Sequence, residues 1–313
     1  MEPKFSLQTS IKESRLFRAF RIITKRIILP GFDRMPLYDV IVFFIKGLMD
    51  GSITTRASSI AFKFFLAMFP AILFLFTLIP YIPIQHFQRT LLETIHTSVP
   101  ENFYVLINST ITDIISRQQG GLLSFGVVMA LYFASNGILG VIVAFNNTSH
   151  SIETRKWWQQ YMISIVLMVI LSLIVVISTA LILLGTAGIK YLNHAHILDQ
   201  SLVLYLIKYG RWVVVLLMVF FAISFLYYLA PAKRQRFRFI SAGSTLATLL
   251  FLATTSGFNF YVNNFAKYNA LYGSIGTIIV IMMWLYFNSI ALLVGFELNA
   301  SIAIAKKTLA TKD

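Results

Sequence analysis

The pair His194-x-His196 is the part of the sequence that comes closest to a metal site in residue type and spacing. Asp199 is the nearest carboxylate. Zinc sites need three or four protein ligands, and metal-assisted hydrolysis of RNA needs several His and carboxylates that converge. The chain has no cysteine, no GxxxxGK[ST] phosphate loop and no GxSxG nucleophile elbow. We therefore expect no metal site, no cofactor and no enzymatic activity.

Polar side chains inside long apolar stretches could serve a function of another kind, since such groups are costly in lipid and mark substrate paths or helix contacts. Lys63 can pair with a carboxylate or extend its stem to the membrane surface. Asn136, beside Gly137 and Gly140, can bind a substrate or hydrogen-bond a neighbouring helix that the glycines let approach closely. The candidates for a pathway within the membrane are Lys63, Asn136, Asn288, Glu297 and Asn299.

The composition indicates that lipid surrounds most of the chain. Of the 313 residues, 58% are hydrophobic and only 12% are charged, and the mean hydropathy is +0.77. Soluble domains carry about 25% charged residues. A soluble protein of this size could not bury so much apolar surface, so we expect an integral membrane protein.

Six apolar stretches approach the roughly 20 residues that a membrane-spanning helix needs. They predict an all-α, polytopic membrane protein with six transmembrane helices. Residues 57–300 form the transmembrane domain, and residues 301–313 form a cytoplasmic tail. The predicted spans lie at about 60–81, 122–145, 161–185, 211–230, 240–262 and 272–297.

Most of the 26 Lys and Arg residues lie before Ala57, between alternate spans, or after the last span. Basic loops face the cytoplasm in membrane proteins, so this asymmetry predicts that both termini are cytoplasmic. An even number of spans requires the two termini to share a side. We therefore expect a multi-pass protein of the cell inner membrane.

Residues 1–56 predict a cytoplasmic region with interfacial amphipathic helices. Basic residues recur there at helical spacing on one side, and Leu16, Phe20, Ile23 and Ile27 recur on another. A helix that binds nucleic acid would share the charge but has less reason for the apolar side. We expect the partner to be a phospholipid bilayer with an anionic inner leaflet, and not nucleic acid. The basic residues are Arg15, Arg18, Arg21, Lys25 and Arg26.

Several short strings in the spans resemble the YihY/BrkB family of integral membrane proteins. They are Arg56-Ala57, Ala61-Phe62 and Phe69-Pro70 in the first span, Ser135-Asn136-Gly137 and Ala144-Phe145-Asn146-Asn147 in the second, and the segment 260–300, which ends in Gly295-x-Glu297-Leu298-Asn299. The resemblance extends from about Arg56 to Ala300. Where the family more often has an aromatic residue, this chain has Lys63.

The resemblance implies an inner-membrane protein, in a family of which some members are linked to export of lipids or other solutes. Our leading hypothesis is a transporter or exporter of a lipid or small solute. The alternative is a structural protein that maintains the cell envelope and transports nothing. Many members also carry a ribonuclease label for tRNA processing, and the scarcity of cytoplasmic His and carboxylates argues against that function.

Glu297 ends a run of residues without charge that begins at Tyr268. Counted from Gly276, the carboxylate falls near the inner boundary of the hydrocarbon core. Lys63 and Arg56 lie near the same boundary at the start of the first span. Because a single buried charge is costly, we expect Glu297 to pair with Lys63 or with Arg56 and to join the last span to the first.

Overall fold

The computed structural model describes nine stretches of the chain and two single residues. They are residues 24, 27, 31–33, 35–50, 52–78, 120–148, 151–152, 155–194, 200–232, 239–264 and 274–310. The basic residues Arg15, Arg18, Arg21, Lys25 and Arg26 lie outside this part of the chain.

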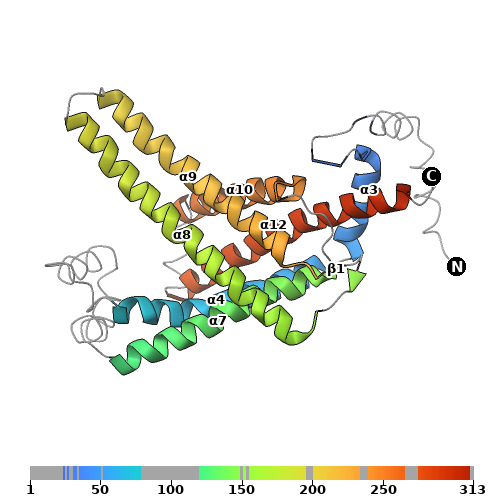
Figure 1. Ribbon diagram of the computed structural model, residues 1–313, viewed down its shortest axis with the longest axis horizontal. Coiled ribbons are helices and arrows are strands. Elements are labelled where there is room, and N and C mark those ends of the chain that lie inside the picture. Colours follow the sequence, from blue (N-terminus) through green and yellow to red (C-terminus); the bar gives the residue numbers. More distant parts are fainter. Residues whose placement is uncertain are drawn as a thin grey trace.

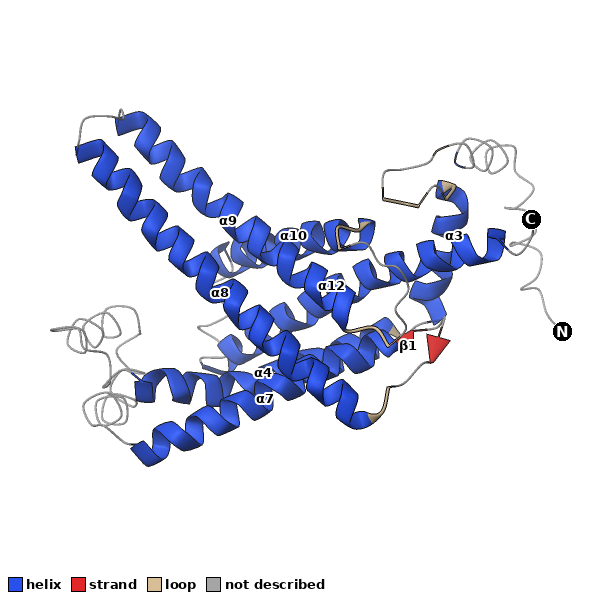
Figure 2. Ribbon diagram, in the orientation of Figure 1, coloured by secondary structure: helices blue, strands red, loops and turns tan. Residues whose placement is uncertain are grey.

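Within the described residues the protein is helical except for one short hairpin (Figure 2). The helices are α3 (Leu37–Asp50), α4 (Ile53–Leu78), α7 (Gly120–Asn146), α8 (Trp157–His194), α9 (Gln200–Leu229), α10 (Ala242–Asn264) and α12 (Ser274–Ala310). Strands β1 (Asn147–Thr148) and β2 (Ser151–Ile152) pair antiparallel, with Asn147 opposite Ile152, and connect α7 to α8. The all-α prediction is confirmed.

Four helices are long and apolar enough to cross a membrane, counted over the described residues. These candidate spans cover Leu123–Asn146, Trp157–Ile182, Tyr209–Leu229 and Ile278–Thr308. They lie in α7, α8, α9 and α12. The protein is therefore an integral membrane protein, and α4 and α10, the first and fifth predicted spans, are not among the four.

The helix ends differ from the predicted spans most clearly in α8, α9 and α12. Helix α9 begins at Gln200, whereas the predicted span begins at about 211. Helix α8 has 38 residues and α12 has 37, which corresponds to about 55 Å at roughly 1.5 Å per residue. Residues 301–310, predicted as a tail, continue α12. Ile302 and Ala305 of this extension, together with Leu298 just before it, are buried in one cluster with Phe32, which precedes α3, and Val40, which lies in it. The extension is helical because protein, in place of lipid, covers its apolar face.

The helices pack in two groups. Helix α4 lies between α7 and α12, α10 packs along α12, and α3 crosses the C-terminal part of α12. Helices α8 and α9 pack mainly on each other and extend away from the rest as a pair (Figure 1). We call this pair the α8–α9 arm.

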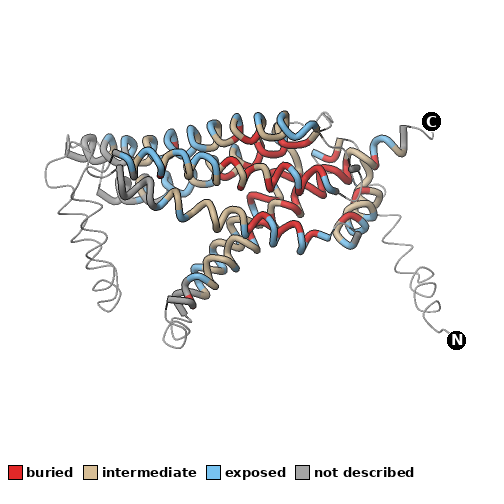
Figure 3. Tube along the Cα trace, turned by 90° about the horizontal axis from the view of Figure 1, so that it is seen from below, coloured by how far each residue is buried: buried red, intermediate tan, exposed pale blue. Residues whose placement is uncertain are grey.

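Burial is concentrated at one end of the molecule, the end where the C-terminus lies (Figure 3). There Ile60 of α4, Ile142 of α7, Leu167 of α8, Ile223 of α9 and Leu293 of α12 belong to one buried cluster. Because α4, α7, α8, α9 and α12 all contribute to it, this packed end positions the polar side chains described next.

Candidate functional site: a buried polar junction

Arg56 is in the first turn of α4. The helix begins at Ile53, after Ser52, whose φ of 43° makes the sharp turn from α3. A cation is unfavourable at a helix N-terminus because the helix dipole is positive there. The Arg56 guanidinium therefore needs acceptors from elsewhere, and two other helices supply them.

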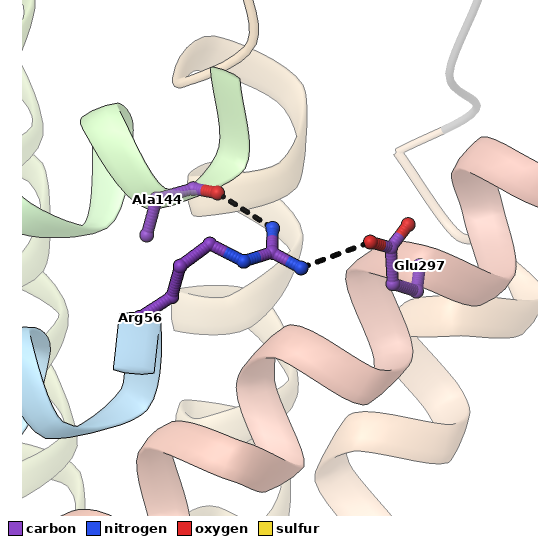
Figure 4. Close-up of polar contacts among 3 residues, drawn as sticks. All are labelled: Arg56, Ala144 and Glu297. Carbon is purple, nitrogen blue, oxygen red and sulfur yellow. Dashed lines mark hydrogen bonds and ion pairs between the residues drawn. The ribbon is translucent and has the colours of Figure 1, made fainter. Parts of the chain in front are cut away.

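The guanidinium of Arg56 bridges α7 and α12 (Figure 4). Its Nη2 donates to Oε1 of Glu297 at 3.0 Å, and its Nη1 donates to the carbonyl oxygen of Ala144 at 2.9 Å. Ala144 lies in the last turn of α7, where carbonyl groups lack partners within the helix and the dipole favours a cation. One side chain thus joins the start of α4, the end of α7 and the middle of α12.

This ion pair is buried. The side chain of Glu297 has no exposed surface, and that of Arg56 is 8% exposed. Glu297 is the only Asp or Glu in the sequence of α4, α7, α8, α9, α10 and α12. Removing Glu297 would leave a buried guanidinium that no other acid in these helices neutralises, and removing Arg56 would leave a buried carboxylate, so the pair constrains how α4 and α12 lie together.

Of the two basic residues proposed as partners of Glu297, the structure places Arg56 beside it. Lys63 lies two turns further along α4, half-buried, against α7. The ammonium group of Lys63 makes no hydrogen bond or ion pair with the described residues. Arg56 and Lys63 share one face of α4, so it is their position along the helix axis that separates their roles.

Asn299 joins α12 to the start of α10. Its Oδ1 accepts a hydrogen bond from the backbone N–H of Gly243 at 2.8 Å, and its Nδ2 donates to Oγ of Ser241 at 2.9 Å. Ser241 precedes α10 and itself accepts from the N–H of Ser244 at 3.1 Å, as an N-cap residue does. Asn299 of α12 thus accepts from the N–H of Gly243, and Ser241 accepts from the N–H of Ser244. Two backbone N–H groups in the first turn of α10 therefore have partners.

Glycines let α10 and α12 approach closely at this point. A Cβ placed on Gly295 would lie 2.5 Å from the carbonyl oxygen of Gly243 and 2.6 Å from Cβ of Ala247. It would also lie 2.6 Å from the hydroxyl of Tyr227. That hydroxyl donates to the carbonyl oxygen of Leu292 at 2.6 Å, which joins α9 to the same part of α12.

Three aromatic rings fill the space beside the ion pair. Phe145 of α7 stacks on Phe296 of α12, with ring centroids 4.2 Å apart and planes 2° apart. Tyr227 of α9 lies edge-on to both rings, at 5.5 and 5.7 Å. Such contacts are favourable beyond the area that they bury. Phe296, the residue before Glu297 in the sequence, is thus packed against both α7 and α9.

Two polar contacts of this region were missed from the sequence. Arg155 donates to the carbonyl oxygens of Leu229, Ala230 and Pro231, at 3.3, 3.4 and 2.5 Å, and so caps the C-terminus of α9. Asn146, the last residue of α7, accepts from the N–H of Ala232 at 2.7 Å. Both residues lie between the second and third predicted spans, Asn146 directly after the second, and that position was the signal available for them.

Asn136 and Asn288, the remaining predicted site residues, lie apart from these contacts. Asn288 is buried, and its Nδ2 donates to the carbonyl oxygen of Trp284 in its own helix at 2.9 Å. Its Oδ1 has no partner among the described residues. Asn136 is half-buried on α7. Its neighbour Gly137 packs on the ring of Phe64, so the glycines allow α4 to approach α7.

The junction, which we define as Arg56, Ala144, Glu297, Asn299 and Gly295 with their partners, joins helices. The described residues bring together no group of three or more His, Asp or Glu that could hold a metal ion. One groove of about 330 Å³ lies between α4 and α12. Its lining is mainly apolar, from Ala61, Ile279, Met282 and Tyr286 among others. The arrangement can hold or release helices, and it presents apolar surface to the bilayer.

Comparisons with known proteins agree with the sequence resemblance. A family model described as "Virulence factor BrkB" matches residues 44–313. A Bacillus subtilis protein, YfkH, whose name describes it as ribonuclease-like, is 32% identical over 253 residues, which cover 81% of this chain and 91% of that protein. A UPF0761 membrane protein of Alteromonas mediterranea is 26% identical over 281 residues, which cover 86% of this chain and 89% of that protein.

No solved structure matches this one. The family model matches the chain from residue 44, within α3, to residue 313, and it therefore includes every residue of the junction. The chain belongs to the BrkB family of integral membrane proteins.

Proposed function

We propose that this protein transports a membrane lipid across the cell inner membrane. In this proposal the chain crosses the membrane six times, with α4 and α10 as the first and fifth spans, and the packed end faces the cytoplasm. The observation that carries the proposal is the contrast between the two ends of the helices. One end is joined by a buried ion pair, and the arm leaves the bundle at the other.

The chemistry of the exposed surface favours a lipid over a small polar solute. Away from the packed end, large apolar side chains are exposed on α7, α8 and α9, and a polar solute finds few hydrogen-bonding groups there. They include Phe125 and Val128, which are 57% and 64% exposed, Val176 and Leu184, which are 63% and 71% exposed, and Trp212, which is 62% exposed. Acyl chains fit such a surface, and surrounding lipid reaches it without crossing water.

The junction supplies the closing contact in this proposal. If the helices separate at the packed end during transport, the Arg56–Glu297 pair must break or move as one unit. A two-state element of this kind is what alternating access requires. The sequence contains no ATPase motif, so the energy would come from a gradient or from a partner.

The test is lipid movement in reconstituted vesicles. Proteoliposomes with a fluorescent phospholipid in both leaflets are treated with an impermeant quencher, with and without an imposed proton gradient. We expect the protein to expose inner-leaflet label that empty vesicles protect. Glu297→Gln, which removes the charge and keeps the shape, should change the rate, whereas Lys306→Gln, at an exposed pair, should not. Folded protein that exposes no extra label under either condition would refute lipid transport.

A second candidate function is a structural protein of the envelope that transports nothing. It is favoured by one observation: at the packed end the side chains of Glu297, Asn299 and Arg155 are engaged in hydrogen bonds that join helices. A deletion strain with a weakened envelope, together with inactive proteoliposomes, would favour this candidate. The ribonuclease name of one relative gains no support here, since the described residues form no group of metal-binding side chains.

A further inference from the structure

Lys63, unlike Arg56, has no hydrogen-bonding or ion-pairing partner among the described residues. It follows Arg56 by seven residues on the same face of α4, which places it about 10 Å further along the helix. Both side chains face α7. Arg56 reaches the carbonyl oxygen of Ala144, and Lys63 lies against Gly140, one turn earlier in α7.

The absence of a side chain at Gly140 makes room for the lysine. A Cβ on Gly140 would lie 2.6 Å from Cδ of Lys63, 3.5 Å from Cε and 3.4 Å from Nζ. The methylene stem of Lys63 therefore lies across α7 where that helix is narrowest. The ammonium group is held beside the backbone of α7, in a notch between two helices.

No acid in the long helices can neutralise this ammonium group. Glu297 is the only Asp or Glu in α4, α7, α8, α9, α10 and α12, and it is bound to Arg56. A lysine within a membrane helix is costly, and an anion close by or access to the interface lowers this cost. The surrounding bilayer supplies one class of anion in quantity, the phosphate groups of its lipids.

We propose that Lys63 and the notch at Gly140 form a binding site for the phosphodiester of an anionic phospholipid. The ammonium group binds the phosphate as a point charge, and the stem of Lys63 extends toward the headgroup region. The acyl chains lie on the apolar surfaces of α4 and α7, where Phe62 and Phe125 are 55% and 57% exposed. This inference deepens the proposed function, on which it rests for the lipid substrate, by naming the headgroup chemistry.

A free phosphate ion offers the same chemistry as the lipid phosphodiester. The position of Lys63 favours the lipid, because the side chain of the adjacent Phe62 is exposed and the other basic residue on this face of α4 is already bound. Arg56 already donates to Ala144 and Glu297. Competition by soluble phosphate separates the two sources.

The experiment measures lipid binding, not lipid transport. Purified protein in detergent is titrated with phosphatidylglycerol or phosphatidylcholine, and native mass spectrometry gives the dissociation constant of the first bound lipid. Lys63→Met should weaken phosphatidylglycerol binding about fivefold, the equivalent of ~1 kcal/mol for a basic residue at an anionic membrane surface. Phosphatidylcholine binding should change less, and Lys63→Arg should retain the preference.

A matched pair of glycine variants in α7 tests the notch. Gly140→Ala should weaken phosphatidylglycerol binding because the new methyl group displaces the lysine stem, whereas Gly121→Ala should not, since no atom lies within 4 Å of that position. If Gly140→Ala and Gly121→Ala changed phosphatidylglycerol binding equally, the proposed role of the notch in binding would be wrong.

Two further outcomes would overturn the site itself. One is unchanged phosphatidylglycerol binding by Lys63→Met. The other is displacement of the lipid by inorganic phosphate at a similar concentration, which would assign the site to a free ion. A protein that binds phosphatidylglycerol through Lys63 but moves no lipid in vesicles would refute the proposed transport and leave this site standing.

Discussion

The packed end and the α8–α9 arm are built from the same kind of apolar helix, yet they bury their residues very differently. Around Glu297, polar groups from α4, α7, α10 and α12 meet in hydrogen bonds, and glycines allow backbones to touch. In the arm, only 11% of the most apolar part of the α8 candidate span is buried within the protein, and large aliphatic side chains are exposed. The candidate spans of α8 and α9 are also more apolar than those of α7 and α12, so the two regions differ both in hydropathy and in which residues have a protein partner.

The difference teaches that helix association in lipid depends on close packing and hydrogen bonds, because lipid is as apolar as a leucine side chain. The junction has the polar and small residues that such association requires. Apart from Tyr227, which contacts the junction, the buried polar residues of the arm among the described residues are Ser164, Ser178 and Ser224. We therefore expect the junction to hold the bundle together and the arm to be the part that can change its position.

The largest predicted effect comes from breaking the ion pair. Glu297→Leu leaves the Arg56 guanidinium buried without its acid and should lower the free energy of unfolding by about 3–5 kcal/mol. The double variant Arg56→Met with Glu297→Leu removes both charges and should recover most of this loss. Thermal unfolding in detergent measures both.

The exposed pair between Lys306 and Asp33, at 3.1 Å, is the matched control. Lys306→Ala should lower the free energy of unfolding by at most ~1 kcal/mol, because water screens the pair. If Glu297→Leu were no more destabilising than Lys306→Ala, the junction would not be the stronger of the two regions.

The next prediction concerns glycines of the two helices that cross at the junction. Gly295→Ala introduces a methyl group against Gly243 and Ala247 and should cost about 1–3 kcal/mol as overpacking. Gly257→Ala, on the exposed side of α10 with no atom within 4 Å, should stabilise the protein by up to ~1 kcal/mol, because alanine is the better helix former. The same substitution should thus shift the melting temperature in opposite directions.

Loss of the cap on α10 should have a smaller effect. Asn299→Ala removes the acceptor for the Gly243 N–H and should cost about 0.5–2 kcal/mol. Asn299→Asp keeps that acceptor but loses the donor to Ser241, so we expect an intermediate melting temperature. Hydrogen exchange at the first turn of α10 would show whether the loss is local, and unchanged exchange in Asn299→Ala would contradict the capping role.

The smallest effect is expected in the arm. Leu184→Ala, at a residue that is 71% exposed, should change the free energy of unfolding by no more than ~0.5 kcal/mol, since no packed neighbour is lost. A melting temperature as low as that of Gly295→Ala would show that the outer part of the arm is packed in the folded protein. The contrast between the regions would then fail.

Much of the fold could be predicted from the sequence, because apolar stretches and their flanking charges depend on local composition. The helical class and the family are confirmed, and α7 and α10 begin and end within two residues of their predicted spans. The continuation of α12 to Ala310 was not predicted. Its apolar face is covered by α3 and not by lipid, and sequence alone does not indicate which of the two covers an apolar residue.

The site could be predicted only in part. Sequence placed an acid and two basic residues near one boundary, but Arg56 and Lys63 lie on the same face of α4, so periodicity could not choose between them. The choice depends on where α12 crosses α4, which is a tertiary property. Similarly, Asn288, Gly295 and Asn299 share a face of α12, but that this face meets α10 is visible only in the structure.

The length of α12 has a consequence for the membrane in which the protein is stable. From Ile278, where its candidate span begins, to Glu297 the helix rises about 28 Å, close to the roughly 30 Å thickness of a bilayer's hydrocarbon core. Bilayers of shorter acyl chains would bring water to Glu297 and weaken its attraction to Arg56, whereas thicker bilayers would bury the pair more deeply. Hydrophobic mismatch of this kind makes acyl-chain length a control on the strength of one ion pair. We therefore expect the lipid composition of the host membrane to set how firmly the packed end is held.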